Sequence, residues 1–194
     1  MKARRYSKSL GRRTHANPGA NISTLDEDEA LEFIDSLQAD PFVLLLDQVQ
    51  DPRNLGACLR SADGAGVDLV VMPTDRSAGL TEVVRHVAAG AAESLALARA
   101  RNLSRFMGRL RERGIRLAGT SDQASESVFE SDLRGPMGLV VGAEGTGIRR
   151  LTADNCDLLV HIPMAGKVDC LNVSVATGIC LFEVHRQRIS KANR

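Results

Sequence analysis

Short runs of apolar residues recur along this chain and constrain its fold more than any other feature. Each run is five or six residues long and almost uninterrupted, which is typical of strands covered on both faces. The six runs lie at residues 42–47, 67–72, 94–98, 115–119, 137–141 and 158–162. Between them, apolar residues at helical spacing predict helices at 54–65, 80–91 and 103–113. This alternation predicts an α/β domain with a mostly parallel sheet flanked by helices.

Length and composition suit one well-buried domain, since the chain has 194 residues, of which 43% are apolar and 25% charged. We expect residues 41–190 to form it, after a helical extension at 24–40 that opens on a capping box from Thr24 to Glu27. Aromatic residues make up only 3%, which argues against RNA-binding sheets that stack bases on exposed rings. No apolar run reaches the roughly 18 residues of a membrane span. The start of the chain does not resemble a secretory signal, so we expect a cytoplasmic protein with no membrane partner.

The first 23 residues form a separate, basic segment. Six cations and no acid occur within residues 1–17, although the whole chain carries a net charge of only +1. The cations are Lys2, Arg4, Arg5, Lys8, Arg12 and Arg13. We expect residues 1–23 to be a flexible arm that contacts nucleic acid or another anionic surface. A solvated tail without a partner is the alternative.

The four cysteines do not form a metal-binding pattern. Cys58, Cys156, Cys170 and Cys180 show no CxxC spacing and no pairing with histidine that suits zinc. We therefore expect reduced, mostly buried thiols and no metal site.

Ligands of parallel α/β sheets bind at the carboxyl ends of the strands, so the residues after each strand are the first candidates. In the segment at residues 46–67, Pro52 redirects the backbone after the strand, and Asn54 is expected to cap the next helix. Arg60 follows about 9 Å further along that helix. An amide and a guanidinium at this edge could hold a phosphate or an oxyanion. The alternative is a capped helix with a surface arginine.

A glycine-rich loop follows the strand at 137–141. Gly142, Gly145 and Gly147 would let backbone groups approach a ligand closely. The loop is not a Walker A motif, and it lacks the third glycine of a dinucleotide-binding fingerprint. Glu144 would also repel a pyrophosphate. The loop therefore favours a nucleoside, with a plain tight turn as the alternative.

The third candidate segment, residues 161–183, joins the last strand to the last helix. The strand ends at Ile162, and Asn172 opens a helix expected at about 170–188. Polar residues at this helix start would face the same sheet edge as the glycine loop. Within the helix, Val175, Ile179 and Phe182 form an apolar stripe that indicates core or a subunit contact.

Together, the three segments resemble the SPOUT class of RNA methyltransferases, in particular its SpoU-TrmH branch of ribose 2′-O-methyltransferases. The first family motif is matched by Asn54, Gly56 and Arg60, the second by Gly142, Glu144 and Gly147, and the third by residues 162–164 and 171–176. Each motif is weak alone, but all three occur in the family's order and strand context. The similarity covers about residues 41–188 and is greatest to the bacterial 23S rRNA guanosine 2′-O-methyltransferases.

The resemblance implies S-adenosylmethionine as methyl donor, an RNA substrate, a homodimer with the site near its interface, and a C-terminal trefoil knot. It implies that Gly142, Ile162 and Leu171 hold the donor. It also implies that a second group lines the reacting ribose, namely Asn54, Arg60, Glu144 and Asn172. A guanidinium is a poor base because its pKa exceeds 12, so we expect Arg60 to orient a phosphate and stabilise the developing alkoxide. No metal is required.

Two departures from the family leave the substrate open. Many of the rRNA enzymes carry an N-terminal RNA-binding domain, whereas about 40 residues precede the similarity here. We expect the basic arm or a partner to replace that domain. Cys170 stands where the family usually has serine, and a thiol is the weaker hydrogen-bond donor. A tRNA ribose methyltransferase and a non-catalytic RNA-binding module of the same fold are the alternatives.

Overall fold

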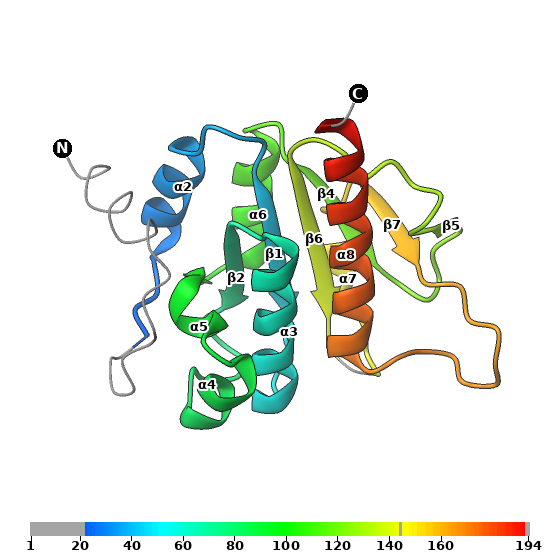
Figure 1. Ribbon diagram of the computed structural model, residues 1–194, viewed down its shortest axis with the longest axis horizontal. Helices are drawn as coiled ribbons and strands as arrows, with labels where there is room; N and C mark the ends of the chain where they lie inside the picture. Colours follow the sequence, from blue (N-terminus) through cyan, green and yellow to red (C-terminus); the bar gives the residue numbers. More distant parts are fainter. Residues whose placement is uncertain (1–21, 144, 193–194) are drawn as a thin grey trace.

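The computed structural model describes residues 22–143 and 145–192. The six arm cations and Glu144 therefore lie outside the described residues. Seven parallel strands form one sheet, in the order β3-β2-β1-β6-β4-β7-β5 (Figure 1). The strands are β1 (Phe42–Asp47), β2 (Leu69–Pro73), β3 (Ala96–Ala100), β4 (Arg116–Thr120), β5 (Glu126–Ser127), β6 (Met137–Gly142) and β7 (Leu158–His161). The predicted α/β class with a mostly parallel sheet is confirmed.

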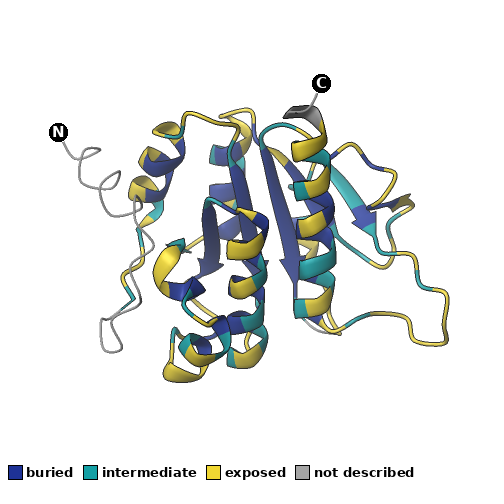
Figure 2. Ribbon diagram, viewed as in Figure 1, coloured by how far each residue is buried: buried dark blue, intermediate teal, exposed yellow. Residues whose placement is uncertain are grey.

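Helices cover both faces of this sheet. They are α2 (Glu27–Asp35), α3 (Pro52–Ala65), α4 (Glu82–Ala88), α5 (Ala91–Ser94), α6 (Leu103–Arg111), α7 (Arg150–Ala153) and α8 (Val173–Ala192). Side chains of β1 alternate between two apolar clusters, so Leu44 packs towards α3 and α8, and Leu45 towards α2 and α6. Every residue of β1 and β6 is buried (Figure 2). Coverage of both faces explains why the strands read as unbroken apolar runs.

Three local expectations need correction. The capping box begins at Asp26, whose side chain accepts the Glu29 backbone N–H at 2.9 Å, and not at Thr24. The helix expected at 80–91 is divided into α4 and α5, because Ala89 and Gly90 adopt positive φ angles of 51° and 94°. The last helix begins at Val173, so residue 170 precedes it.

The strand order determines where a site can form. β6 lies between β1 and β4, and β7 pairs with the other side of β4. The carboxyl ends of these strands therefore lie side by side, and the loops after β6 and β7 leave from the same edge (Figure 1). In the part of the chain that the structure describes, no helix has the length and apolar character needed to cross a bilayer.

Candidate active site

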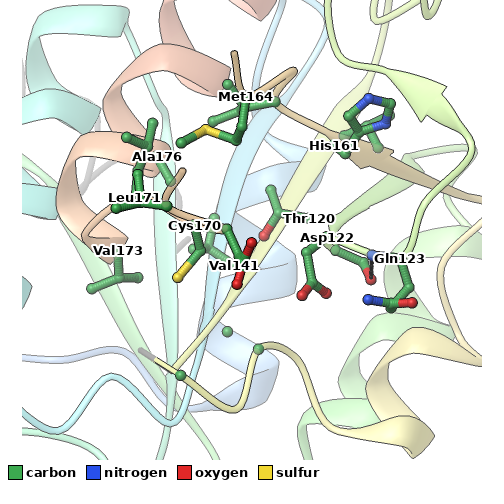
Figure 3. A pocket seen from close by; sticks show the side chains of 18 of the residues that line it. Thr120, Asp122, Gln123, Val141, His161, Met164, Cys170, Leu171, Val173 and Ala176 are labelled. Atoms are coloured by element: carbon green, nitrogen blue, oxygen red, sulfur yellow. Dashed lines mark hydrogen bonds between the residues drawn. The ribbon is translucent and has the colours of Figure 1, made fainter. Parts of the chain in front are cut away.

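A cavity of about 790 Å³ lies at the carboxyl ends of β6, β4 and β7 (Figure 3). Its walls come from the residues after β4, the glycine-rich loop after β6, the β7–α8 connection and the first turn of α8. The volume falls in the usual range for pockets that bind small molecules or cofactors. The cavity thus occupies the sheet edge at which the sequence predicts a ligand.

All three residues that were expected to hold the donor line this cavity, namely Gly142, Ile162 and Leu171. Gly142 is the last residue of β6, and a Cβ atom there would lie 2.0 Å from the carbonyl carbon of Gly147. Only glycine therefore fits at position 142. Ile162 packs against the apolar cluster beneath α3 and α8. The structure brings the three residues together, and their role in donor binding remains a prediction.

The glycine loop, by which we mean residues 142–143 and 145–149, folds back over the end of its own strand. Ala143 and Gly147 exchange two backbone hydrogen bonds of 3.1 and 2.9 Å. Gly145 and Gly147 have φ angles of 79° and 64°, which a side chain would oppose. The loop therefore forms a closed turn, and its backbone conformation favours glycine at positions 145 and 147.

A buried acid lies beside this turn. Asp47 ends β1, is 0% exposed, and is paired in register with Gly142 of β6. Both of its carboxylate oxygens are bonded by Arg149, the last residue of the glycine loop.

Two of the expected catalytic residues meet at the start of α8, although they are 118 positions apart in the sequence. The Asn172 amide donates to Oδ1 of Asn54 at 3.1 Å. Oδ1 of Asn172 accepts the backbone N–H and the hydroxyl of Ser174, at 3.0 and 2.6 Å. Asn54 does not cap α3 as expected, because Asp51 accepts from the backbone N–H of Asn54 and is the N-cap.

Of the other two expected catalytic residues, one lies on α3 and one lies outside the described residues. Asn54 and Asn172 do not line the cavity either, but Asn172 lies between Leu171 and Val173, which do. Arg60 is exposed on α3 and does not line the cavity. Glu144 belongs to the residues that the structure does not describe. The four expected catalytic residues are thus brought together only in part.

Polar residues at the ends of β4 and β7, and just after β4, line the cavity and were missed by the sequence analysis. Thr120, Asp122 and Gln123 lie on the side opposite Leu171, and His161 ends β7 (Figure 3). The hydroxyl of Thr120 donates to the Val140 carbonyl oxygen at 3.3 Å. Thr120, Asp122 and Gln123 follow the run predicted at 115–119, so the rule that ligands bind at the carboxyl ends of parallel strands would have found them. His161 falls inside the run predicted at 158–162, where that rule gives no signal.

The cysteines differ sharply in their surroundings. Burial raises the pKa of Cys58 to about 11 and that of Cys180 to about 12. Burial, followed by the nearby Asp157 carboxylate, raises the pKa of Cys156 to about 12. Cys170 is exposed and lines the cavity, and all four thiols are free. Among the described residues, no cluster of histidine, cysteine and acidic side chains is arranged to hold a metal ion.

Comparison with protein families matches residues 41–182 to the SpoU rRNA Methylase family. The chain belongs to the SpoU rRNA methylase family. This confirms the resemblance drawn from the three motifs.

Curated members of the family are similar to this chain over most of its length. The 23S rRNA (guanosine-2′-O-)-methyltransferase RlmB of Pseudomonas putida is 52% identical to this chain. The match covers 81% of this chain and 63% of the length of that RlmB. RlmB of Pectobacterium atrosepticum is 54% identical over 84% of this chain and 66% of its own. The chain thus spans slightly less than two thirds of these relatives.

Solved SpoU methyltransferases share the fold. The AviRb methyltransferase of Streptomyces viridochromogenes, solved with AdoMet, has a TM-score of 0.74 and 30% identity, covering 80% of this chain and 63% of AviRb. The A. aeolicus TrmH/SpoU tRNA modifying enzyme has a TM-score of 0.73 and 28% identity, covering 86% of this chain and 84% of that enzyme.

Proposed function

We propose that this SpoU methylase transfers a methyl group from S-adenosylmethionine to the ribose 2′-hydroxyl of a guanosine in 23S rRNA. The observation that carries the proposal is the cavity at the sheet edge, lined by residues of two family motifs and flanked by the Asn54–Asn172 pair. The RlmB relatives support the choice of RNA and base, since they are 52% and 54% identical to this chain.

The cavity has the chemistry that the donor requires. Ile162, Leu171 and Val141 offer an apolar surface for a flat base, while Thr120 and Asp122 offer polar groups for hydroxyls or an ammonium. When bound, the donor supplies an electrophilic methyl group. The work of the protein is then to orient the attacking hydroxyl and to exclude competing water.

On this proposal, Asn54, Arg60, Glu144 and Asn172 line the reacting ribose. The hydrogen bond that Asn172 donates to Asn54 orients both amides before RNA binds, which lowers the entropic cost of ordering them. Arg60 stays protonated and stabilises negative charge on the 2′-oxygen while orienting a neighbouring phosphate. No metal takes part in these roles.

We further propose that the enzyme is a homodimer that pairs through α8. Val175, Phe182 and Ile189 are 50%, 50% and 51% exposed, and their spacing of seven residues places them on one side of the helix. An exposed apolar stripe of this kind is typical of an interaction surface. Because α8 begins at the Asn172 cluster, pairing there brings the second subunit close to the site.

The experiment that tests the activity measures tritium transfer from labelled S-adenosylmethionine to 23S rRNA and to tRNA. Arg60→Ala should lower transfer to rRNA by at least about a hundredfold, the cost of losing one oxyanion donor. Calorimetry should find donor binding unchanged. Normal turnover of this variant would contradict the role of Arg60, and native protein that modifies neither RNA would contradict catalysis.

A tRNA ribose methyltransferase is the second candidate. The A. aeolicus tRNA modifying enzyme is matched over 84% of its own length, against 63% and 66% for the two RlmB relatives. Transfer to tRNA alone in the same assay would establish it.

A further inference from the structure

Asp47 is a charged group in a place where charge is costly. Its side chain is 0% exposed at the carboxyl end of β1, a strand whose other side chains are divided between the apolar clusters of the two faces. A buried carboxylate is tolerated only when hydrogen bonds and an opposite charge compensate for lost hydration. The partner that compensates Asp47 should therefore reveal what the residue does.

That partner is Arg149, through its main chain and its side chain together. The Arg149 backbone N–H donates to Oδ2 at 3.0 Å, and Nε donates to Oδ1 at 2.8 Å. Nη2 lies 2.7 Å from the same Oδ1. One residue thus engages both oxygens, and the backbone contact fixes the position of the chain as well as the side chain.

Strand pairing at one end and the Arg149 hydrogen bonds at the other connect both ends of the glycine loop to the end of β1. The loop starts at Gly142, which is paired in register with Asp47, and ends at Arg149, which is bonded to it. Between these ends the turn is tight enough that no Cβ fits at Gly142. A shift of Arg149 away from Asp47 would therefore move the backbone that lines the cavity.

We propose that Asp47 and Arg149 are positioning residues that hold the glycine loop in the conformation that binds the methyl donor. The proposal rests on the proposed function, since it takes S-adenosylmethionine to be the ligand of the cavity. Neither residue lines the cavity, so both act through the loop.

The test compares donor affinity and turnover in Arg149→Ala, which removes the guanidinium and keeps the backbone N–H. Calorimetry with S-adenosylmethionine should give a Kd raised about tenfold, the usual effect of losing a charge-assisted hydrogen bond. KM for the donor should rise in parallel, while kcat at saturating donor stays close to native. Arg149→Lys should recover part of the affinity, because it keeps the charge without the planar fork.

Arg149→Ala leaves the buried charge of Asp47 without its partner, which can unfold the protein. A second variant therefore repeats the test without an unpaired buried charge. The double variant Asp47→Asn with Arg149→Ala is neutral at this position and keeps an amide oxygen for the backbone N–H. It should also bind the donor about tenfold more weakly.

The control is Arg113→Ala. Arg113 makes a similar two-bond contact with Asp35, at 2.8 and 3.0 Å, but follows α6 before the amino end of β4. Its removal should leave donor affinity unchanged.

The proposal is overturned if the double variant keeps the native donor Kd, whatever its melting temperature. Failure of the native protein to bind the donor would instead count against the proposed function. The two results are distinguished by the native titration alone.

Discussion

Two residues of the cavity wall, Gly142 and Cys170, differ in how much space the surrounding atoms leave for a side chain. At Gly142, the constraint is the backbone of Gly147, which occupies the space of a side chain. At Cys170, nothing comparable acts, since its side chain is exposed on the β7–α8 connection. Changes at these two positions should therefore have opposite outcomes, although both residues line the same cavity.

Gly142→Ala should abolish tight donor binding. The new methyl group would meet backbone atoms 2.0 to 2.1 Å away, so the turn must move. A displacement of about 1 Å at a site commonly costs about a hundredfold in activity. Donor titration and methyl-transfer assays measure the effect.

The control is Gly108→Ala in α6, where nothing lies within 4 Å of the new Cβ. That variant should bind the donor normally and be more stable by about 0.5–1 kcal/mol. Native donor affinity in Gly142→Ala would contradict the packing argument.

Cys170 should be the one thiol that reacts quickly with a disulfide reagent near pH 8. Burial raises the pKa of Cys58, Cys156 and Cys180, and these thiols should react only on unfolding. Because Cys170 lines the cavity, S-adenosylmethionine should slow its reaction.

Cys170→Ser should remove the fast phase and transfer methyl groups at or above the native rate, since a hydroxyl is the stronger donor. Absorbance of the released thiolate and the tritium assay provide the readouts. An inactive serine variant would mean that the thiol itself is required.

Among the elements, α8 connects the site to the opposite end of the molecule. Its start lies at the Asn172 cluster, and near its end Arg188 donates to the carbonyl oxygens of Gly135 and Asp40. Between these points, Glu183 accepts from Arg186 and from Gln187, which also donates to the Ser131 carbonyl. The helix thereby anchors the connection between β5 and β6.

Glu183→Gln should destabilise the protein at neutral pH and have little effect in acid. Hydrogen bonds from Arg186 lower the pKa of Glu183 below its usual value, despite the opposing effect of burial. A lowered folded-state pKa stabilises the fold above the unfolded value of about 4.3, and this contribution disappears as the pH falls through the folded value. Urea unfolding should give a loss of about 1–2 kcal/mol at pH 7.

The difference between native protein and Glu183→Gln should narrow steadily below about pH 4. Glu32→Gln, at an exposed position of α2, serves as the control and should change stability little at either pH. A difference that is independent of pH would rule out the charge of Glu183 as the cause.

Elements with a strong periodic pattern were predicted well from sequence. The run at 42–47 matches β1, because a strand buried on both faces leaves an unbroken apolar signature. β5 and α7 were missed, because two and four residues are too few to show a period. The division between α4 and α5 was missed because alanine gives no sequence signal for the left-handed conformation of Ala89.

The candidate site was also predicted only in part, because sequence patterns are local and some of its contacts join distant positions. Family motifs identified Gly142, Ile162 and Leu171, which line one cavity. The pairing of Asp47 with Arg149 joins positions 102 residues apart, and no local pattern reports such a contact. It becomes visible only when β1 and β6 are seen as neighbours.

At the scale of the whole molecule, the exposed face of α8 is the feature with the clearest consequence for assembly. Of the stripe expected from sequence, Val175 and Phe182 are half exposed, so they are not core residues of the described chain. Subunit contact is the expectation that remains, and Ile189 extends the stripe by a further two turns.

Phe182→Glu combined with Ile189→Glu should convert the proposed dimer into a monomer. Two charges at the centre of an apolar interface would be buried without partners, which disfavours association strongly. Sedimentation and light scattering measure the mass. The control, Val83→Glu on α4, changes a residue that is 47% exposed and should leave the mass unchanged. A double variant that stays dimeric would exclude α8 as the pairing face.

The strand order also determines when each part of the sheet can form while the chain is synthesised on the ribosome. β2 pairs with β1 on one side and with β3 on the other, and all three strands are complete once residue 100 has emerged. β4 has no earlier neighbour, because its partners β6 and β7 are both made later. The cavity requires the loop after β6 and the start of α8, so it is completed only after residue 173 has emerged. A truncated translation product that ends before residue 137 can thus pair three of the seven described strands and still be unable to bind a ligand at this edge.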